Sequence, residues 1–206
     1  INKVFSSKKY RYKILYSKSI KEKTFLNSQN KSEYYSLSEL NRLIKKDSSL
    51  NLDWKPNTLI KAKMIRKKFK KTLVTMHLKY TKPFNERESN ISPTFWNKFF
   101  DLFKNETNLD FLILGADESD KKIKKLSNIF WAKKMNISLD TQLCLISLSD
   151  QYLGMASGIS AAAMLTNNPY LIFKNKFHHS SQMKKEINKN KTFFAKKKQY
   201  IFLEKP

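Results

Sequence analysis

The chain is poor in cysteine and glycine, and both shortages limit what it can be. A single cysteine, Cys144, excludes a disulfide framework and a zinc site built from cysteines. It lies in the apolar run LCLI, which predicts a small buried side chain rather than a reactive thiol. The three glycines are Gly115, Gly154 and Gly158, and their spacing does not form the GxGxxG fingerprint of NAD-binding domains. P-loop and HExxH motifs are also absent from the sequence.

Long hydrophobic runs are missing as well. No apolar stretch approaches the roughly 20 residues that a membrane-spanning helix needs, and neither terminus has the pattern of a signal peptide. The hydrophobic content of 40% is nevertheless enough to bury a core. We therefore expect a cytoplasmic protein, with contact at the inner face of a membrane as an open alternative. Because the chain begins with Ile1 instead of methionine, we expect it to be part of a longer protein.

Arginine is scarce although the chain is strongly basic. The net charge is +24, but only four of the 41 basic residues are arginine. The excess charge lies in the flanks, with +15 over residues 1–71 and +7 over 175–206, against +2 over 72–174. Proteins that read bases or clamp phosphates favour the planar fork of arginine. A solvated basic surface is therefore favoured over nucleic-acid binding, and attraction to an anionic membrane is a third interpretation.

The pattern of elements predicts an α/β fold with two parts. Residues 1–53 are polar and irregular, and a helix follows that Asn57 could cap, with an apolar stripe of Leu59, Ile60, Met64 and Phe69. We assign residues 1–71 to a remnant of an N-terminal domain plus this linker helix. We assign residues 72–206 to one domain with its core at 72–174.

The core alternates between apolar runs and helical patterns. Strands are predicted at 72–78, 109–117, 129–133, 151–157 and 169–174, and helices at 93–103, 118–126, 138–149 and 158–168. Ser92 and Ser138 stand where helix N-caps belong. One helix should have a wide apolar face of Phe95, Phe99 and Phe103 with Trp96 and Phe100 beside them, and another a core-facing stripe of Leu139, Leu143 and Ile146. This alternation is typical of a Rossmann-like parallel sheet with flanking helices.

The segment MASGISAAA places a Ser-Gly turn between a strand and a helix of small residues. Ser157 and Gly158 would lie at the carboxyl end of the strand, where the backbone amides of a helix start can receive a phosphate. Small residues also suit tight packing of a helix on a sheet, so both interpretations stay open. His77 and Lys79 follow the first strand at the same edge of the sheet, two residues apart.

The run DQYLGMASGISAAAMLTNNPYLIF resembles the C-terminal domain of GT-B glycosyltransferases, especially the heptosyltransferase-like group. With VTMHLKYTKPFNE as its opening strand and loop, the chain looks most like bacterial surface-polysaccharide glycosyltransferases over about residues 72–180. It departs from heptosyltransferases at Ala156, where they usually carry Asp, and at Ala161 or Ala162, where they often carry His.

The resemblance implies a nucleotide-diphosphate-sugar donor, no cofactor, and a cell-surface glycan or lipid-linked acceptor. The positions that would meet the diphosphate are Ser157, Gly158, Ile159 and Ser160, together with His77 and Lys79. The positions that would line the nucleobase and ribose are Gly115, Asp117, Ala132, Lys133 and Met135. No catalytic base is assigned, because GT-B enzymes usually take it from the other domain or the interdomain cleft.

Three further interpretations stay open at this point. A nucleotide-sugar 2-epimerase-like enzyme would need carboxylates near the sugar, for which Asp117 and Asp150 are the candidates. A basic RNA-binding protein would show binding that falls steeply with salt, and a non-catalytic remnant would lack a ligand-sized crevice. The neighbouring pair His178 and His179 is a poor metal site, because adjacent side chains diverge and no carboxylate or cysteine lies at ligand spacing.

Overall fold

The computed structural model describes residues 5–6, 51–79, 91–115, 122–175, 187–188, 191–192 and 198–204. The chain divides into two compact units, Ile1–Trp54 and Lys55–Pro206. In the first unit, β1 (Phe5–Ser6) pairs antiparallel with β2 (Asn51–Leu52). The helix α3 (Pro56–Arg66), which the sequence analysis grouped with the first segment, lies in the second unit.

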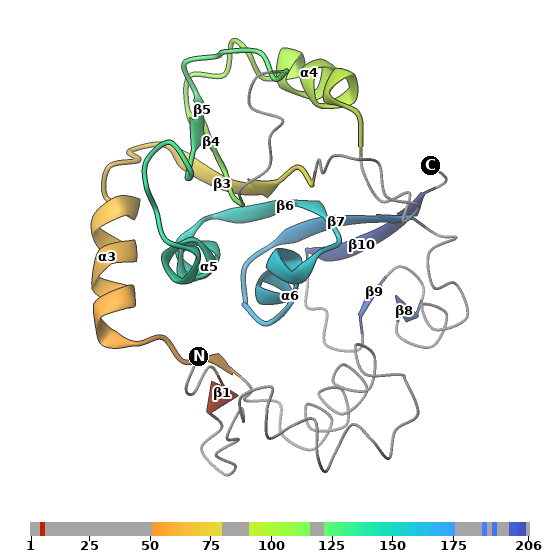
Figure 1. The fold of residues 1–206 in the computed structure, drawn as a ribbon. Coiled ribbons are helices and arrows are strands. Elements are labelled where there is room, and N and C mark those ends of the chain that lie inside the picture. The colour runs from red at the N-terminus through yellow and green to blue at the C-terminus, as the bar shows by residue number, and fades with distance from the viewer. Residues whose placement is uncertain are drawn as a thin grey trace. The chain divides into compact units, whose positions relative to one another are not determined.

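The second unit is built on a six-stranded sheet in which every pair of neighbours is parallel. Its strands are β3 (Thr72–His77), β4 (Leu109–Ile113), β5 (Ile129–Trp131), β6 (Gln151–Met155), β7 (Tyr170–Asn175) and β10 (Gln199–Glu204). Across the sheet they run β5-β4-β3-β6-β7-β10 (Figure 1). Numbered along the chain this order is 3-2-1-4-5-6, that of doubly wound nucleotide-binding sheets. The predicted Rossmann-like parallel sheet is confirmed, and β10 is an additional strand that the sequence analysis did not predict.

The strand order changes direction between β3 and β6. After β3 the chain builds outward through β4 and β5, and then crosses back to place β6 on the other side of β3. His77 at the end of β3 is in register with Gly154 of β6. The connections on the two sides of this point leave in opposite directions, and in doubly wound sheets ligands bind outside the carboxyl ends of the strands at such a point.

Helices cover both faces of the sheet (Figure 1). One face carries α4 (Pro93–Leu102), and the other carries α5 (Leu139–Leu148) and α6 (Gly158–Met164). Helix α3 packs against α5. Because the central strands are buried on both sides, five of the six residues of β3 are buried, including the polar Thr75 and His77. Two further short strands, β8 (Ile187–Asn188) and β9 (Lys191–Thr192), pair antiparallel.

Helix α4 begins as predicted, and Trp96, Phe99 and Phe100 of its predicted apolar face pack in or against the core. The Ser92 hydroxyl accepts a hydrogen bond from the amide of Phe95, so the predicted N-cap is confirmed. Trp96 and Phe100 form the buried edge, whereas Phe95 is 46% exposed. The indole of Trp96 donates to the carbonyl of Leu78 over 3.3 Å, which ties the helix to the end of β3.

Two other helices differ from their predicted faces. In α5, Leu139 is 56% exposed, and the buried residues are Thr141, Gln142, Cys144, Leu145 and Ile146. This helix packs against α3 and α6 as well as the sheet, so one apolar stripe does not describe it.

In α3 the N-cap is Lys55 without a side-chain bond, so the prediction of an Asn57 cap was wrong. Ile60 and Met64 are exposed rather than part of a core stripe. Residues 122–126 are not helical, which contradicts the predicted helix there in the part that the structure describes. Among the described helices, none combines the length and apolar character that crossing a bilayer requires.

Candidate functional site

The strands β3 and β6 bring His77 and Ser157 into contact at their carboxyl ends. The Nδ1 atom of His77 lies 2.9 Å from the Ser157 hydroxyl oxygen. That oxygen also accepts a hydrogen bond from the Ser160 amide over 3.2 Å. With its lone pair used in this way, the Ser157 hydroxyl can donate its hydrogen to Nδ1, which suits the imidazole tautomer protonated at Nε2.

Ser157 and Ser160 form a capping box at the start of α6. The Ser160 hydroxyl oxygen accepts from the Ser157 amide over 2.8 Å, and Ser160 itself is buried. The hydroxyl of Ser160 is therefore committed to the turn, although the sequence analysis placed it among the diphosphate contacts. Gly158 is exposed, and a Cβ atom built on it would meet no atom within 4 Å. Among the described residues, the position of a side chain at 158 is therefore open.

Lys79 reaches the same turn by a different route from the one predicted. Its Nζ donates to the carbonyl of Ala156 over 2.7 Å. Its φ angle is 49°, so the backbone turns into the left-handed region instead of continuing the strand. The prediction that Lys79 continues the extended strand was wrong. His77 and Lys79 nevertheless contact neighbouring residues where the chain leaves β6, namely Ser157 and Ala156.

Gly115 lies against the His77 ring and needs to be a glycine. Its φ is +90°, and a Cβ atom there would lie 3.1 Å from Cδ2 of His77 and 3.4 Å from Cδ1 of Ile159. The Gly115 amide donates to the side-chain oxygen of Gln142 over 2.7 Å. The side-chain nitrogen of Gln142 donates to the carbonyl of Ile137 over 2.7 Å.

Gln142 thus joins the turn after β4 to the loop after β5, a role that the sequence analysis missed. The available signal was a glutamine directly before the apolar run LCLI, where a buried side-chain amide must find partners.

The loop after β5 holds the remaining predicted positions that the structure describes. Ala132 is fully buried, its amide donates to Ile113 and its carbonyl accepts from Ile137. Both backbone groups of Ala132 are therefore used inside the protein rather than directed at a nucleobase. Lys133 is exposed and Met135 is half-buried.

Asp150 lies at the opposite edge of the sheet from the position that an epimerase site requires. It precedes β6, where its carboxylate accepts from the Leu73 amide over 2.7 Å and pairs with Arg66 over 2.9 Å. The prediction of Asp150 at the carboxyl edge was wrong. Asp117, His178 and His179 lie outside the residues that the structure describes.

Tyr152 places a buried hydroxyl below the turn. Tyr152 is 1% exposed, and its hydroxyl has no hydrogen-bond partner among the described residues. Burial raises the pKa of this hydroxyl, and the nearby Ser157 hydroxyl offsets part of the increase. Beside Ser157 there is thus a buried hydroxyl group whose hydrogen-bonding capacity is not used by the described residues.

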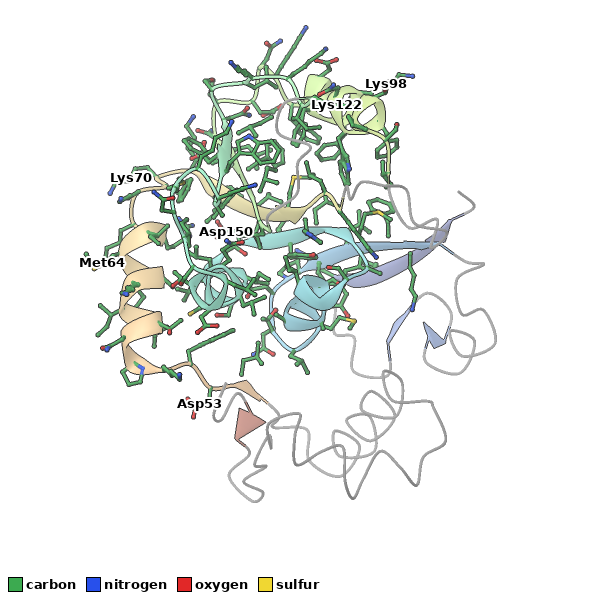
Figure 2. All side chains as sticks on the ribbon, in the orientation of Figure 1. Asp53, Met64, Lys70, Lys98, Lys122 and Asp150 are labelled. Atoms are coloured by element: carbon green, nitrogen blue, oxygen red, sulfur yellow. The ribbon has the colours of Figure 1, made fainter. Side chains whose placement is uncertain are left out.

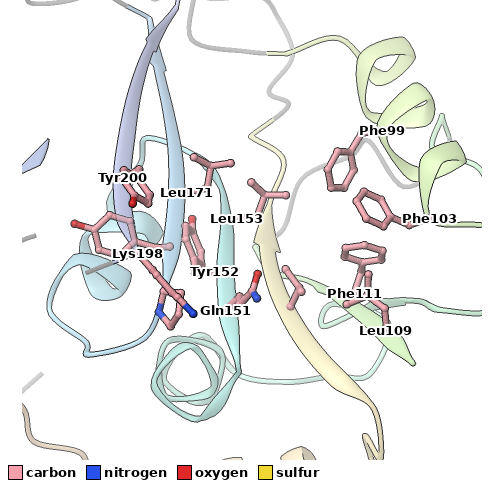
Figure 3. Close-up of a pocket in the computed structure, with 13 residues that line it drawn as sticks. Phe99, Phe103, Leu109, Phe111, Gln151, Tyr152, Leu153, Leu171, Lys198 and Tyr200 are labelled. Atoms are coloured by element: carbon pink, nitrogen blue, oxygen red, sulfur yellow. The ribbon is translucent and has the colours of Figure 1, made fainter. Parts of the chain in front are cut away.

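A hollow lies on the α4 face of the sheet, and His77 is not among the residues that line it. It is a groove of about 700 Å³ between the aromatic side chains of α4 and the strands β6, β7 and β10 (Figure 3). Its labelled walls include Phe99, Phe103, Leu153, Leu171 and Tyr200. The lining is mainly apolar, and Gln151 and Lys198, which belong to it, lie where β6 and β10 begin. This groove lacks the convergent polar groups found around His77.

No family model, curated protein or solved structure matches this chain. Within the described ranges, no group of three or more His, Cys, Asp or Glu side chains is arranged to hold a metal ion. The order and direction of the strands support the α/β Rossmann-like arrangement.

Proposed function

We propose that this domain binds a nucleoside-diphosphate sugar in the crevice at the carboxyl ends of β3 and β6, as the donor-binding half of a glycosyltransferase. The observation that carries the proposal is the His77–Ser157 contact at the point where the strand order reverses. Doubly wound sheets bind nucleotides at this point. The open space in front of Gly158 and the unsatisfied hydroxyl of Tyr152 support a ligand site there.

In the proposed reaction, an acceptor hydroxyl attacks the anomeric carbon of the donor sugar and gives its proton to a base, which the resemblance to GT-B enzymes assigns to the other domain or the interdomain cleft. The bond from that carbon to the diphosphate oxygen breaks, and the nucleoside diphosphate leaves with the electron pair. Negative charge increases on the leaving phosphate, and a cation or N–H donor held beside it lowers the barrier. His77 and Lys79 supply those groups in the proposal, and Ser157 orients the His77 ring through its bond to Nδ1.

The resemblance of MASGISAAA and its flanks to GT-B C-terminal domains supports the donor class. It extends the proposal to a cell-surface glycan or lipid-linked acceptor. No cofactor is required, since the nucleotide sugar is itself the substrate. The 2-epimerase alternative loses one of its two candidate carboxylates, because Asp150 lies at the amino edge and pairs with Arg66.

Calorimetric titration of the full chain with UDP, GDP, ADP and CDP tests the proposal. We expect at least one of them to bind at millimolar concentration or below. His77→Gln and Ser157→Ala should each weaken that binding by roughly tenfold to a hundredfold, about the value of one hydrogen bond to a charged ligand.

Ser147→Ala is the matched control for the serine substitution. Ser147 donates to the carbonyl of Cys144 within α5, away from the turn, so its removal should leave nucleotide binding unchanged. Failure of all four diphosphates to bind a folded protein at millimolar concentration would contradict the proposal.

A further inference from the structure

The outer side of α3 exposes two large apolar side chains. Ala62 is the buried residue of this helix, which packs against α5. Ile60 and Met64 each stand two residues from Ala62, about 160° away around the helix axis. They are 56% and 63% exposed. Figure 2 shows Met64 on the side of α3 that is turned away from α5.

Lysines surround this apolar pair on both sides. Lys61 and Lys63 lie on either side of the line from Ile60 to Met64, and Lys67 and Lys68 follow in the turn directly after the helix ends at Arg66. All four are exposed. We call these six residues the outer α3 surface.

The basic character extends over the whole segment. From Lys55 to Lys71 the chain has seven lysines and one arginine and no acidic residue. All seven lysines are exposed, whereas Arg66 is bonded to Leu148, Phe69 and Asp150 at the inner side of the helix. The outward charge therefore comes from lysine alone.

We propose that the outer α3 surface docks on an anionic lipid membrane. A helix that lies flat on a bilayer has an apolar strip that enters the boundary between headgroups and acyl chains, with lysines along both margins. Ile60 and Met64 provide this strip. The lysine stems can extend past it to place their ammonium groups among anionic headgroups. This inference stands independently of the proposed donor site.

The composition of the surface favours lipid over nucleic acid. A nucleic-acid backbone would draw on the lysines but would leave Ile60 and Met64 without a partner. Arginine, which dominates specific contacts with nucleic acid, does not contribute to the outer α3 surface. Both the apolar pair and the lysines have a role only at a surface that is apolar inside and anionic outside.

Co-sedimentation of the full chain with lipid vesicles tests the proposal. The vesicles are phosphatidylcholine with and without phosphatidylglycerol, at physiological salt. We expect binding to the anionic vesicles and little to the neutral ones. The double variant Ile60→Ser, Met64→Ser should lower the partition coefficient by at least about tenfold while keeping every charge. The double variant Lys61→Gln, Lys68→Gln should lower it by roughly tenfold or more while keeping the apolar pair.

Matched controls come from α4 and the turn that follows it. Leu102 is 77% exposed, so Leu102→Ser removes an exposed apolar side chain elsewhere. Lys98 and Lys104 are also exposed, and Lys98→Gln, Lys104→Gln removes two charges there. Both controls should bind within about twofold of the unaltered protein at physiological salt, where distant charges are screened.

Two outcomes would overturn the proposal. One is absence of binding to anionic vesicles, or equal binding by the protein with Ser at positions 60 and 64. The other is a combination of three results. An RNA duplex displaces the protein from the vesicles, the variant Lys61→Gln, Lys68→Gln loses RNA binding, and the variant Ile60→Ser, Met64→Ser binds both vesicles and RNA like the unaltered protein. That second outcome would identify the surface as an electrostatic interface for nucleic acid.

Discussion

The Nδ1 atom of His77 and the hydroxyl oxygen of Ser157 lie 2.9 Å apart, although 80 positions separate the two residues in the chain. This contact joins the end of β3 to the start of α6. It depends on the close approach of the two strands below it, because a Cβ atom on Gly154 would lie 2.5 Å from the carbonyl oxygen of His77. The absence of a side chain at position 154 thus keeps the backbone of β3 in place beside the turn.

Gly154→Ala should therefore be strongly destabilising. The added methyl group would meet the main chain of the central strand, which cannot move without disturbing its own ladder, and we expect a loss of about 3 kcal/mol or more in the free energy of unfolding. At Gly158 the space for a Cβ atom is open, so Gly158→Ala should leave that free energy unchanged or raise it by less than about 1 kcal/mol. Urea unfolding of both variants checks the pair, and equal losses would contradict the described packing.

Arg66 should not be replaceable by lysine. Its guanidinium donates to the carbonyls of Leu148 and Phe69 and to the carboxylate of Asp150, at 3.2, 2.7 and 2.9 Å. An ammonium group cannot span these three acceptors. We expect Arg66→Lys to lower the free energy of unfolding by about 1–2 kcal/mol, because the site is partly exposed. Lys67→Gln, at the exposed next position, should change it by less than about 0.5 kcal/mol. Equal effects of the two substitutions would refute this role of Arg66.

Tyr152→Phe should not destabilise the protein. Removing a buried tyrosine hydroxyl usually costs a hydrogen bond of about 1 kcal/mol. The Tyr152 hydroxyl has no such partner in the described residues, so its removal relieves an unsatisfied group. We expect thermal unfolding at an equal or higher temperature. A clear drop in the melting temperature would show that the hydroxyl is bonded in the folded protein.

The Cys144 thiol should be protected in the folded protein. Burial raises its pKa from 9.0 to about 11, and no other thiol is present. Near pH 8 a thiol-specific reagent should label the native chain slowly and the unfolded chain quickly.

The same pKa shift predicts a loss of stability at alkaline pH. Between about pH 9 and 11 the unfolded thiol is ionised while the folded one keeps its proton, so the free energy of unfolding falls as the pH rises through this window. Cys144→Ala removes this contribution. An identical alkaline loss in that variant and the unaltered protein would contradict the assignment.

The sequence predicted the central strands because buried parallel strands are apolar on both faces. The runs beginning at Thr72, Leu109, Ile129, Gln151 and Tyr170 are strands in the structure, each shorter than or close to its predicted length. Helix faces were harder to predict. Helix α5 packs on several sides and α3 exposes apolar residues on its outer side, so the spacing of apolar residues did not identify the buried edge of either.

The residues of the candidate site were predicted in position more than in role. His77, Lys79, Gly115 and Ser157 do meet at one edge, because ends of parallel strands share it. The bonds that occupy Ser160 and Ala132 depend on turn geometry, and the bridge made by Gln142 depends on packing between loops. Turn geometry and packing between loops cannot be predicted from a single sequence. The misplaced Asp150 had a simpler cause, since a residue that precedes a strand lies at its amino end.

The most direct test of the donor site is the nuclear magnetic resonance of the histidine rings during a nucleotide titration. The chain has three histidines, and the spectrum of His77→Gln assigns the signal of His77. If a nucleoside diphosphate occupies the crevice, the His77 ring resonances should shift in a saturable way, and Ser157→Ala should weaken the apparent affinity. Binding of the nucleotide with shifts only at His178 and His179, or with no histidine shift, would contradict a site between β3 and β6.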